Sequence, residues 1–206
     1  MSGPPPLTRI VLASASPRRL ELLCSLGLDV EVVHSGYHEP DLPGVAPAEL
    51  ASRHAAEKLA AALQQRQGDT LVVAADTVVD LDGKALGKPS DASEARAMLR
   101  LLSGRTHAVH TAFALAVPGH EGWIEERSTT AVTFYSLDDR EIADYVATGE
   151  PMDKAGSYGI QGGAASLVES IDGDFYTVMG FPLGRFVRAL RRLGFRLPAA
   201  KEKPIN

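Results

Sequence analysis

A long apolar run with a single carboxylate in its middle constrains this chain more than any other feature. Residues 71–79 read Leu-Val-Val-Ala-Ala-Asp-Thr-Val-Val, and this run predicts a buried strand that continues to Leu81. Strands disfavour aspartate, and a buried carboxylate without a partner is energetically costly. Asp76 therefore either ends a strand and caps a turn, or it is kept inside the fold for chemistry.

Length and charge limit the class of protein. The chain has 206 residues, enough for one domain, or one domain of two lobes, with a substantial core. Its net charge of −5 argues against a general nucleic-acid-binding protein, because no surplus of lysine and arginine is left for phosphates. We find no apolar run of signal-peptide or membrane-spanning length, so we expect a cytoplasmic protein with no membrane partner. The single cysteine, Cys24, falls in the apolar pattern of the first expected helix and is interpreted as a small core residue.

The apolar pattern predicts that strands and helices alternate. The expected strands cover residues 9–13, 30–33, 71–81, 84–86, 109–117, 129–135, 165–171 and 175–179. The expected helices cover residues 16–26, 47–66, 91–103, 136–148 and 182–193. Asp82-Gly83 and Asp172-Gly173 indicate hairpin turns. Because two hairpins interrupt a parallel pattern, we predict an α/β fold with a mixed twisted sheet and flanking helices.

Basic residues gather at the turn from the first strand to the first helix. Ser14 and Ser16 precede the helix, and Arg18 with Arg19 falls in its first turn, where a positive charge opposes the helix dipole. These arginines are either solvated surface residues or ligands of a bound phosphate, which would satisfy both the dipole and the guanidinium groups.

Two lysines have informative surroundings. Lys58 shares one helix face with Ala51, Ala55 and Ala62, so it either extends along this face to solvent or reaches into a cleft. Lys88 lies between a glycine and a proline after the second hairpin strand, where an exposed loop lysine is the simpler interpretation.

No histidine or cysteine cluster has the spacing of metal ligands. His107 and His110 are three residues apart on an expected strand, hence on opposite faces, and we interpret all six histidines as structural or surface residues. The common nucleotide motifs GxGxxG and GxxxxGK[ST] do not occur, and no Ser-His-Asp arrangement is indicated. The remaining arginines, lysines and carboxylates suit an anionic substrate such as a triphosphate, with a divalent cation.

Four segments, in their order along the chain, resemble one family. They are Ser14-Ala15-Ser16-Pro17-Arg18-Arg19, Asp76-Thr77, Gly87-Lys88-Pro89 and residues 153–162, which read DKAGSYGIQG. From about residue 10 to residue 195 the chain resembles the Maf-like nucleoside triphosphate pyrophosphatases. The resemblance implies two lobes around a central cleft, as in inosine-triphosphatase-like folds, and a single domain over residues 9–196. We expect a disordered N-terminus over residues 1–8 and a flexible tail over residues 197–206. The family also implies a homodimer and a divalent cation such as Mg²⁺ or Mn²⁺.

The resemblance implies a role for each matching residue. Asp76 would accept a proton from the attacking water, and Glu39 together with Asp76 would hold the metal. The family has an acidic pair where this chain has His38-Glu39, so one acidic contact is missing. The residues that would bind phosphate or substrate are Ser14, Arg18, Arg19, Lys58, Lys88 and Lys154. Base selection in the branch that acts on dTTP and UTP would rest on Arg18, Thr77 and Gln161.

The expected activity is hydrolysis of dTTP and UTP, with modified pyrimidine nucleotides as further substrates, to the monophosphate and pyrophosphate. Two alternatives stay open at this point. The substrate could instead be 7-methyl-GTP or another nucleotide. The protein could also bind nucleotide and regulate cell division without significant catalysis.

Overall fold

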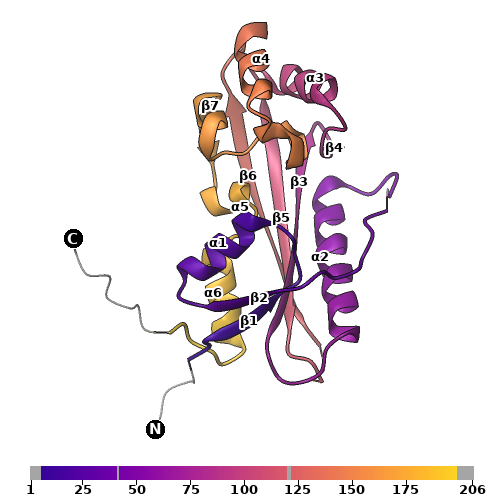
Figure 1. The fold of residues 1–206 in the computed structure, drawn as a ribbon, viewed down its shortest axis with the longest axis vertical. Helices are drawn as coiled ribbons and strands as arrows, with labels where there is room; N and C mark the ends of the chain where they lie inside the picture. Colours follow the sequence, from indigo (N-terminus) through magenta and orange to yellow (C-terminus); the bar gives the residue numbers. More distant parts are fainter. Residues whose placement is uncertain (1–5, 41, 120–121, 199–206) are drawn as a thin grey trace, which may run out of the picture.

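The fold is built on one mixed sheet (Figure 1), and the computed structural model describes residues 6–40, 42–119 and 122–198. The seven strands are β1 (Arg9–Leu12), β2 (Asp29–Val32), β3 (Val72–Leu81), β4 (Lys84–Leu86), β5 (Thr106–Ala116), β6 (Ile124–Phe134) and β7 (Val168–Asp172). Their order is β2-β1-β3-β5-β6-β7, and β4 also pairs with β3. β1 is parallel to β2 and β3, whereas every other pairing is antiparallel. The predicted mixed α/β sheet is confirmed.

Helices cover both faces of this sheet. They are α1 (Pro17–Ser25), α2 (Pro47–Gln64), α3 (Ala92–Leu102), α4 (Asp139–Ala147), α5 (Phe175–Met179) and α6 (Leu183–Arg192). Three short 3₁₀ turns, η1 (Glu150–Asp153), η2 (Ala155–Ser157) and η3 (Gly162–Ser166), follow α4. Side-chain caps begin two of these helices, since the Asp91 side chain accepts from Glu94 N and Asp138 forms a full capping box with Glu141. No helix in the described part of the chain is long and apolar enough to cross a membrane.

The strand predicted over residues 175–179 is wrong, because this segment is helix α5. The Asp174 carboxylate accepts hydrogen bonds from Tyr176 N and Thr177 N, which is an N-cap, and Gly180 ends the helix with a φ of 108°. β7 pairs with β6 instead of forming a hairpin with this segment. Aromatic and β-branched residues favour strands, and that preference obscured the capping aspartate.

Cys24 is exposed, so the prediction of a core cysteine is wrong. The buried residues of α1 are Arg19, Leu22 and Leu23. Cys24 lies 100° further round the helix than Leu23, which takes it off that buried face.

The sheet buries different partners on its two faces. Val72, Ala74 and Val78 of β3 pack with the alanines and Leu59 of α2. The alternate residues Val73 and Ala75 join the cluster of α1 and α6. Figure 1 shows α2 on one side of β3 and α1 with α6 on the other. Successive residues of β3 therefore face different helices.

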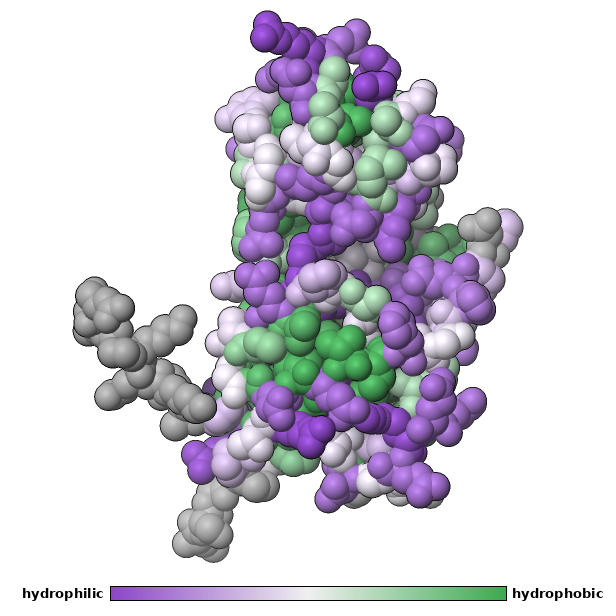
Figure 2. Space-filling model, viewed as in Figure 1, coloured by the Kyte–Doolittle hydropathy of each residue, from purple (hydrophilic) through white to green (hydrophobic). Residues whose placement is uncertain are grey.

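A gap lies along one edge of β3. β1 pairs with it only at Val72 and Val73, and β4 begins to pair at Val79, so in the described part of the chain no strand lies beside residues 74–78 on this edge. On the face of α1, the core is divided at the same level into one cluster containing Ala75 and a second containing Val79. Figure 2 shows hydrophilic side chains at mid-height on the viewed face, above an apolar area over α1 and β2. The fold thus leaves a polar level between two apolar clusters.

The ends of the described chain lie together. Pro6 forms a bridge with Arg196, and Leu7 is buried and donates its backbone N–H to Arg196 O. Residues 1–5 and 199–206, which include most of the two segments expected to be disordered, lie outside the described residues.

Candidate active site

A cavity of about 860 Å³ opens at the gap beside β3. Its walls come from the turn before α1, the loop after β2, one face of α2, the middle of β3, the loop after β4, the segment around η2, and the end of α5. The sequence-predicted residues that line it are Ser14, Arg18, Arg19, Glu39, Lys58, Asp76, Thr77, Lys88 and Lys154. The fold therefore brings together side chains from distant segments, since Ser14 and Lys154, which are 140 positions apart, share this cavity.

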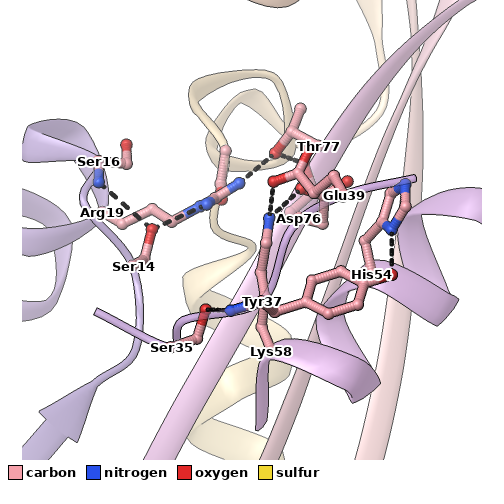
Figure 3. A network of polar contacts seen from close by, with 12 residues as sticks. Ser14, Ser16, Arg19, Ser35, Tyr37, Glu39, His54, Lys58, Asp76 and Thr77 are labelled. Carbon is pink, nitrogen blue, oxygen red and sulfur yellow. Dashed lines mark hydrogen bonds and ion pairs between the residues drawn. The ribbon is translucent and has the colours of Figure 1, made fainter. Parts of the chain in front are cut away.

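The centre of the cavity is an ammonium group held between two carboxylates. Lys58 Nζ lies 2.6 Å from Asp76 Oδ1 and 2.5 Å from Glu39 Oε1 (Figure 3). The side chains of Lys58 and Asp76 are only 11% and 9% exposed, whereas that of Glu39 is 52% exposed. Asp76 does not end its strand, because β3 continues past it to Leu81, and its carboxylate lies beside a buried ammonium group. Lys58 likewise reaches into the cleft and does not extend to solvent.

Glu39 is held as a carboxylate by this arrangement. Burial raises the pKa of Glu39, but the hydrogen bond and positive charge of Lys58, aided by His54 and Lys88, outweigh burial and lower the pKa below its ordinary value. The Glu39 side chain is therefore negatively charged at neutral pH.

His54 and Tyr37 are cavity residues that the sequence analysis missed. His54 lies one turn before Lys58 on α2, is 4% exposed, and its Nδ1 is 3.1 Å from the Tyr37 hydroxyl. Tyr37 is two residues before Glu39, so this contact joins the Glu39 loop to α2. The i, i+4 spacing of His54 and Lys58 was the available signal, because it places both on one helix face.

Arg19 is a buried connector in the wall of the cavity. Its Nε donates to Gly180 O at 2.9 Å, its Nη1 to Ser14 Oγ at 3.0 Å, and its Nη2 to Thr77 Oγ1 at 3.0 Å. Burial lowers the pKa of the guanidinium, opposed by the charge of Asp76, and arginine still stays charged in this setting. Arg19 therefore joins the turn before α1, strand β3 and the end of α5.

Thr77 continues this network into the sheet. Thr77 Oγ1 lies 2.9 Å from Thr111 Oγ1 on β5, and Thr111 Oγ1 donates to the backbone oxygen of Thr177 on α5 at 2.7 Å. Thr111 and Thr177 are fully buried. These hydroxyl groups form the polar level between the two apolar clusters.

Three further cations, Arg18, Lys88 and Lys154, line the cavity. Arg18 Nη1 lies 4.0 Å from Asp153 Oδ2, and Lys154 Nζ donates to Asp153 Oδ1 and to Glu150 O, each at 2.6 Å. Lys88 is exposed on the loop after β4 and lines the cavity. These charges are near enough to one another to face a ligand with several negative groups.

Gln161 is not brought to the cavity. It is exposed immediately before η3 and does not line the cavity. Its expected part in base selection stays a prediction.

The two strand histidines lie on opposite faces, as predicted. His107 Nε2 lies 2.7 Å from the Tyr158 hydroxyl in one apolar cluster, and burial lowers the pKa of His107 to about 4. His110 lies on the α2 face, 3.2 Å from Asp80 Oδ2. Within residues 6–40, 42–119 and 122–198, no group of three or more His, Cys, Asp or Glu side chains could hold a metal ion. Any metal at the cavity would therefore need ligands beyond the protein.

Known proteins of similar sequence cover almost the whole chain. A protein of Geobacter sulfurreducens named dTTP/UTP pyrophosphatase is 50% identical over 186 residues, which are 90% of this chain and 97% of that protein. A Thermus thermophilus protein of the same name is 48% identical over 199 residues, 95% of this chain and 98% of that one. Among solved structures, the Staphylococcus aureus Ham1 protein has a TM-score of 0.44 and 16% identity, and covers 62% of this chain and 72% of that one. The family model described as Maf-like protein matches residues 9–193. The chain belongs to the Maf-like protein family.

Proposed function

We propose that this protein hydrolyses dTTP and UTP to the nucleoside monophosphate and pyrophosphate. One observation carries the proposal. The buried Lys58–Asp76 pair and Glu39 lie in a cavity that is also lined by the basic residues Arg18, Arg19 and Lys88. The relatives named dTTP/UTP pyrophosphatase support the same activity, since they align with nearly the full chain.

In this reaction Asp76 is the proton acceptor. Lys58 donates to Oδ1 and holds the carboxylate in one orientation, and Oδ2 has no hydrogen-bond partner among the described residues. A water molecule at Oδ2 would lose its proton as it attacks the α-phosphorus. A positioned carboxylate of this kind is suited to general base catalysis.

The leaving group is pyrophosphate, and its negative charge grows as the bond to the α-phosphorus breaks. Arg18, Lys88 and Lys154 line the cavity and would stabilise that charge, which is the dominant contribution in phosphoryl transfer. Ser14 would donate a hydrogen bond to a phosphate oxygen. Arg19, whose guanidinium already binds three protein oxygens, would act chiefly by holding Ser14 and Thr77 in place.

A divalent cation fits the donor set. Glu39 and Asp76 offer two hard carboxylate oxygens on the same lysine, and Mg²⁺ commonly binds one or two carboxylates while substrate phosphates and water complete its shell. When bound, the ion would neutralise phosphate charge. Glu39 and Asp76 are the residues that would hold it.

Oligomeric state, domain extent, partners and location are further parts of the proposal. The family resemblance suggests a homodimer and a single domain over residues 9–196, and the charge of −5 suggests that nucleic acid is not a partner. A cytoplasmic location suits a substrate of the nucleotide pool. Sedimentation of the purified chain tests the dimer.

The test is a panel of dTTP, UTP, CTP and 7-methyl-GTP with Mg²⁺, Mn²⁺ or a chelator. We expect dTTP and UTP to give monophosphate and pyrophosphate faster than 7-methyl-GTP, and no product in chelator. Release of orthophosphate instead would refute the bond assignment. Equal or faster turnover of 7-methyl-GTP would refute the specificity, and binding without any product would favour a regulatory protein.

A further inference from the structure

The hydrogen positions on Thr77 and Thr111 follow from the atoms around them. Thr111 Oγ1 lies 2.7 Å from the backbone oxygen of Thr177, which can only accept, so the Thr111 hydroxyl donates its single proton there. Thr111 Oγ1 also lies 2.9 Å from Thr77 Oγ1. Because the proton of Thr111 is already used, Thr77 must donate to Thr111.

Thr77 is left with one free lone pair. A hydroxyl group has one proton and two lone pairs. Its proton is directed to Thr111, and Arg19 Nη2, at 3.0 Å, donates to one lone pair. Thr77 lines the cavity. Toward a bound molecule, its hydroxyl can therefore only accept a hydrogen bond.

Ser14 binds the other terminal nitrogen of Arg19, and its hydroxyl group has the opposite role, because toward a bound molecule it can only donate. Ser14 Oγ accepts from Arg19 Nη1 at 3.0 Å and from Ser16 N at 3.3 Å, so both of its lone pairs are used and its proton is free (Figure 3). Phosphate oxygens only accept, so they suit Ser14 and not Thr77. The partner of Thr77 must carry an N–H or O–H group.

We propose that Thr111 is a positioning residue for substrate selection, which acts by fixing Thr77 Oγ1 as the acceptor for an N–H or O–H group of the nucleotide. This inference rests on the proposed function. Uracil and thymine carry an N–H at ring position 3, whereas cytosine has a lone pair there and would meet the lone pair of Thr77. A sugar hydroxyl is the other source of such a donor, and the two sources are separable by experiment.

The central variant is Thr111→Val, which keeps the shape of the side chain and removes its hydroxyl. Thr177 O retains the N–H of Gly180 at 3.1 Å, so the variant leaves no orphaned carbonyl. The Thr77 hydroxyl is then free to turn and donate. We expect the ratio of kcat/KM for UTP to kcat/KM for CTP to fall by about tenfold or more. In the variant, Thr77 is no longer fixed as an acceptor for UTP, and it no longer has to present a lone pair to the lone pair of cytosine. Thr111→Ser should restore the ratio.

A matched control comes from the next strand. Thr130 on β6 is also fully buried, and its hydroxyl donates to Asp174 O at 2.9 Å, so it fastens α5 to the sheet in the same way without a hydrogen bond to Thr77. Thr130→Val should lower the melting temperature about as much as Thr111→Val does, and it should leave the UTP to CTP ratio unchanged.

A second comparison separates base from sugar. If the donor is the base, Thr111→Val changes the kcat/KM ratio of UTP to CTP and leaves the ratio of dTTP to its 3′-deoxy analogue unchanged. If the donor is the sugar, the second ratio changes and the first does not. Either result supports the assignment. A folded Thr111→Val protein with both ratios unchanged overturns it. The dissociation constants of UTP and CTP give the same comparison without turnover. If the protein lacked pyrophosphatase activity, the proposed function would be refuted, and the dissociation constants would still test the role of Thr111.

Discussion

Replacing Lys58 with methionine should destabilise the protein far more than replacing the carboxylate that it binds. In Lys58→Met, the Asp76 carboxyl group, at 9% side-chain exposure, faces Glu39 without the cation between them. In Asp76→Asn, Lys58 still has Glu39 at 2.5 Å. The two variants break the same ion pair, but only the first leaves a buried charge without a partner.

The size of the effect follows from that asymmetry. Removing one partner of a buried pair costs about 3 kcal/mol or more, because the remaining charge is desolvated without compensation. For a chain of this length, each kcal/mol lowers the melting temperature by roughly 2–4 °C, so Lys58→Met should melt about 6–12 °C lower than the wild type. Asp76→Asn should stay within about 1 kcal/mol of the wild type. Adding Asp76→Asn to Lys58→Met should recover most of the loss, because Glu39 alone is half exposed and can be solvated.

Thermal unfolding followed by far-ultraviolet circular dichroism measures all four proteins as a double-mutant cycle. Arg53→Met is the control on the same helix, because Arg53 forms an exposed i, i+4 pair with Glu49 and should cost less than about 1 kcal/mol. If Lys58→Met melted like Arg53→Met, or if the two site substitutions simply added, the charges would be solvated and the reasoning would fail.

Three further predictions concern activity and pH. Asp76→Asn should bind UTP and release pyrophosphate at least about a hundredfold more slowly, the usual loss for a general base, and near-normal turnover would make Asp76 a structural residue. Arg18→Ala and Lys88→Ala should each lower kcat/KM. The control Arg140→Ala, which removes a side chain that is 89% exposed on α4, should not lower it. Equal kinetics for all three variants would show that Arg18 and Lys88 are ordinary solvated surface residues. His107 has its pKa lowered from 6.5 to about 4 by burial, so the unfolded chain binds a proton in this interval that the folded protein does not. Stability should therefore fall by about 3 kcal/mol as pH drops from 6.5 to 4, and for His107→Gln the plot of melting temperature against pH should be flatter over this range. Glu39, whose carboxyl pKa is lowered from 4.5, loses its contribution only as pH falls below about 4.5.

Local sequence rules located the residues whose position depends on one element. The 100° helix rotation placed Lys58 on a buried alanine face, and the apolar run placed Asp76 inside a strand, so both members of the central pair could be found without knowing the fold. Apart from residues 175–179, which form helix α5, the order of strands and helices followed from the same periodicities. These signals depend on neighbours within a few residues, which a sequence contains directly.

Contacts between distant segments could not be read in that way. Arg19 binds Gly180, which is 161 positions away, and nothing near either residue indicates the other. The polarity of Thr77 depends on Thr111 and on a carbonyl of α5, a helix that strand preference concealed. The features that the sequence did not predict are thus the tertiary hydrogen bonds, because each of them depends on several elements at once.

Asp76 and Thr77 are adjacent in sequence and point to opposite faces of β3, one toward α2 and the other toward Arg19. If Asp76 and Thr77 have the proposed roles, substitutions at position 77 change which nucleotide is accepted while the carboxylate of Asp76 stays in place, and evolution or protein engineering can vary the two properties separately. A change in the length of β3 has no such freedom. Inserting one residue between the start of the strand and Asp76 would exchange its two faces, placing a carboxylate against Arg19 and removing it from Lys58. This strand should accept many substitutions and hardly any insertion or deletion.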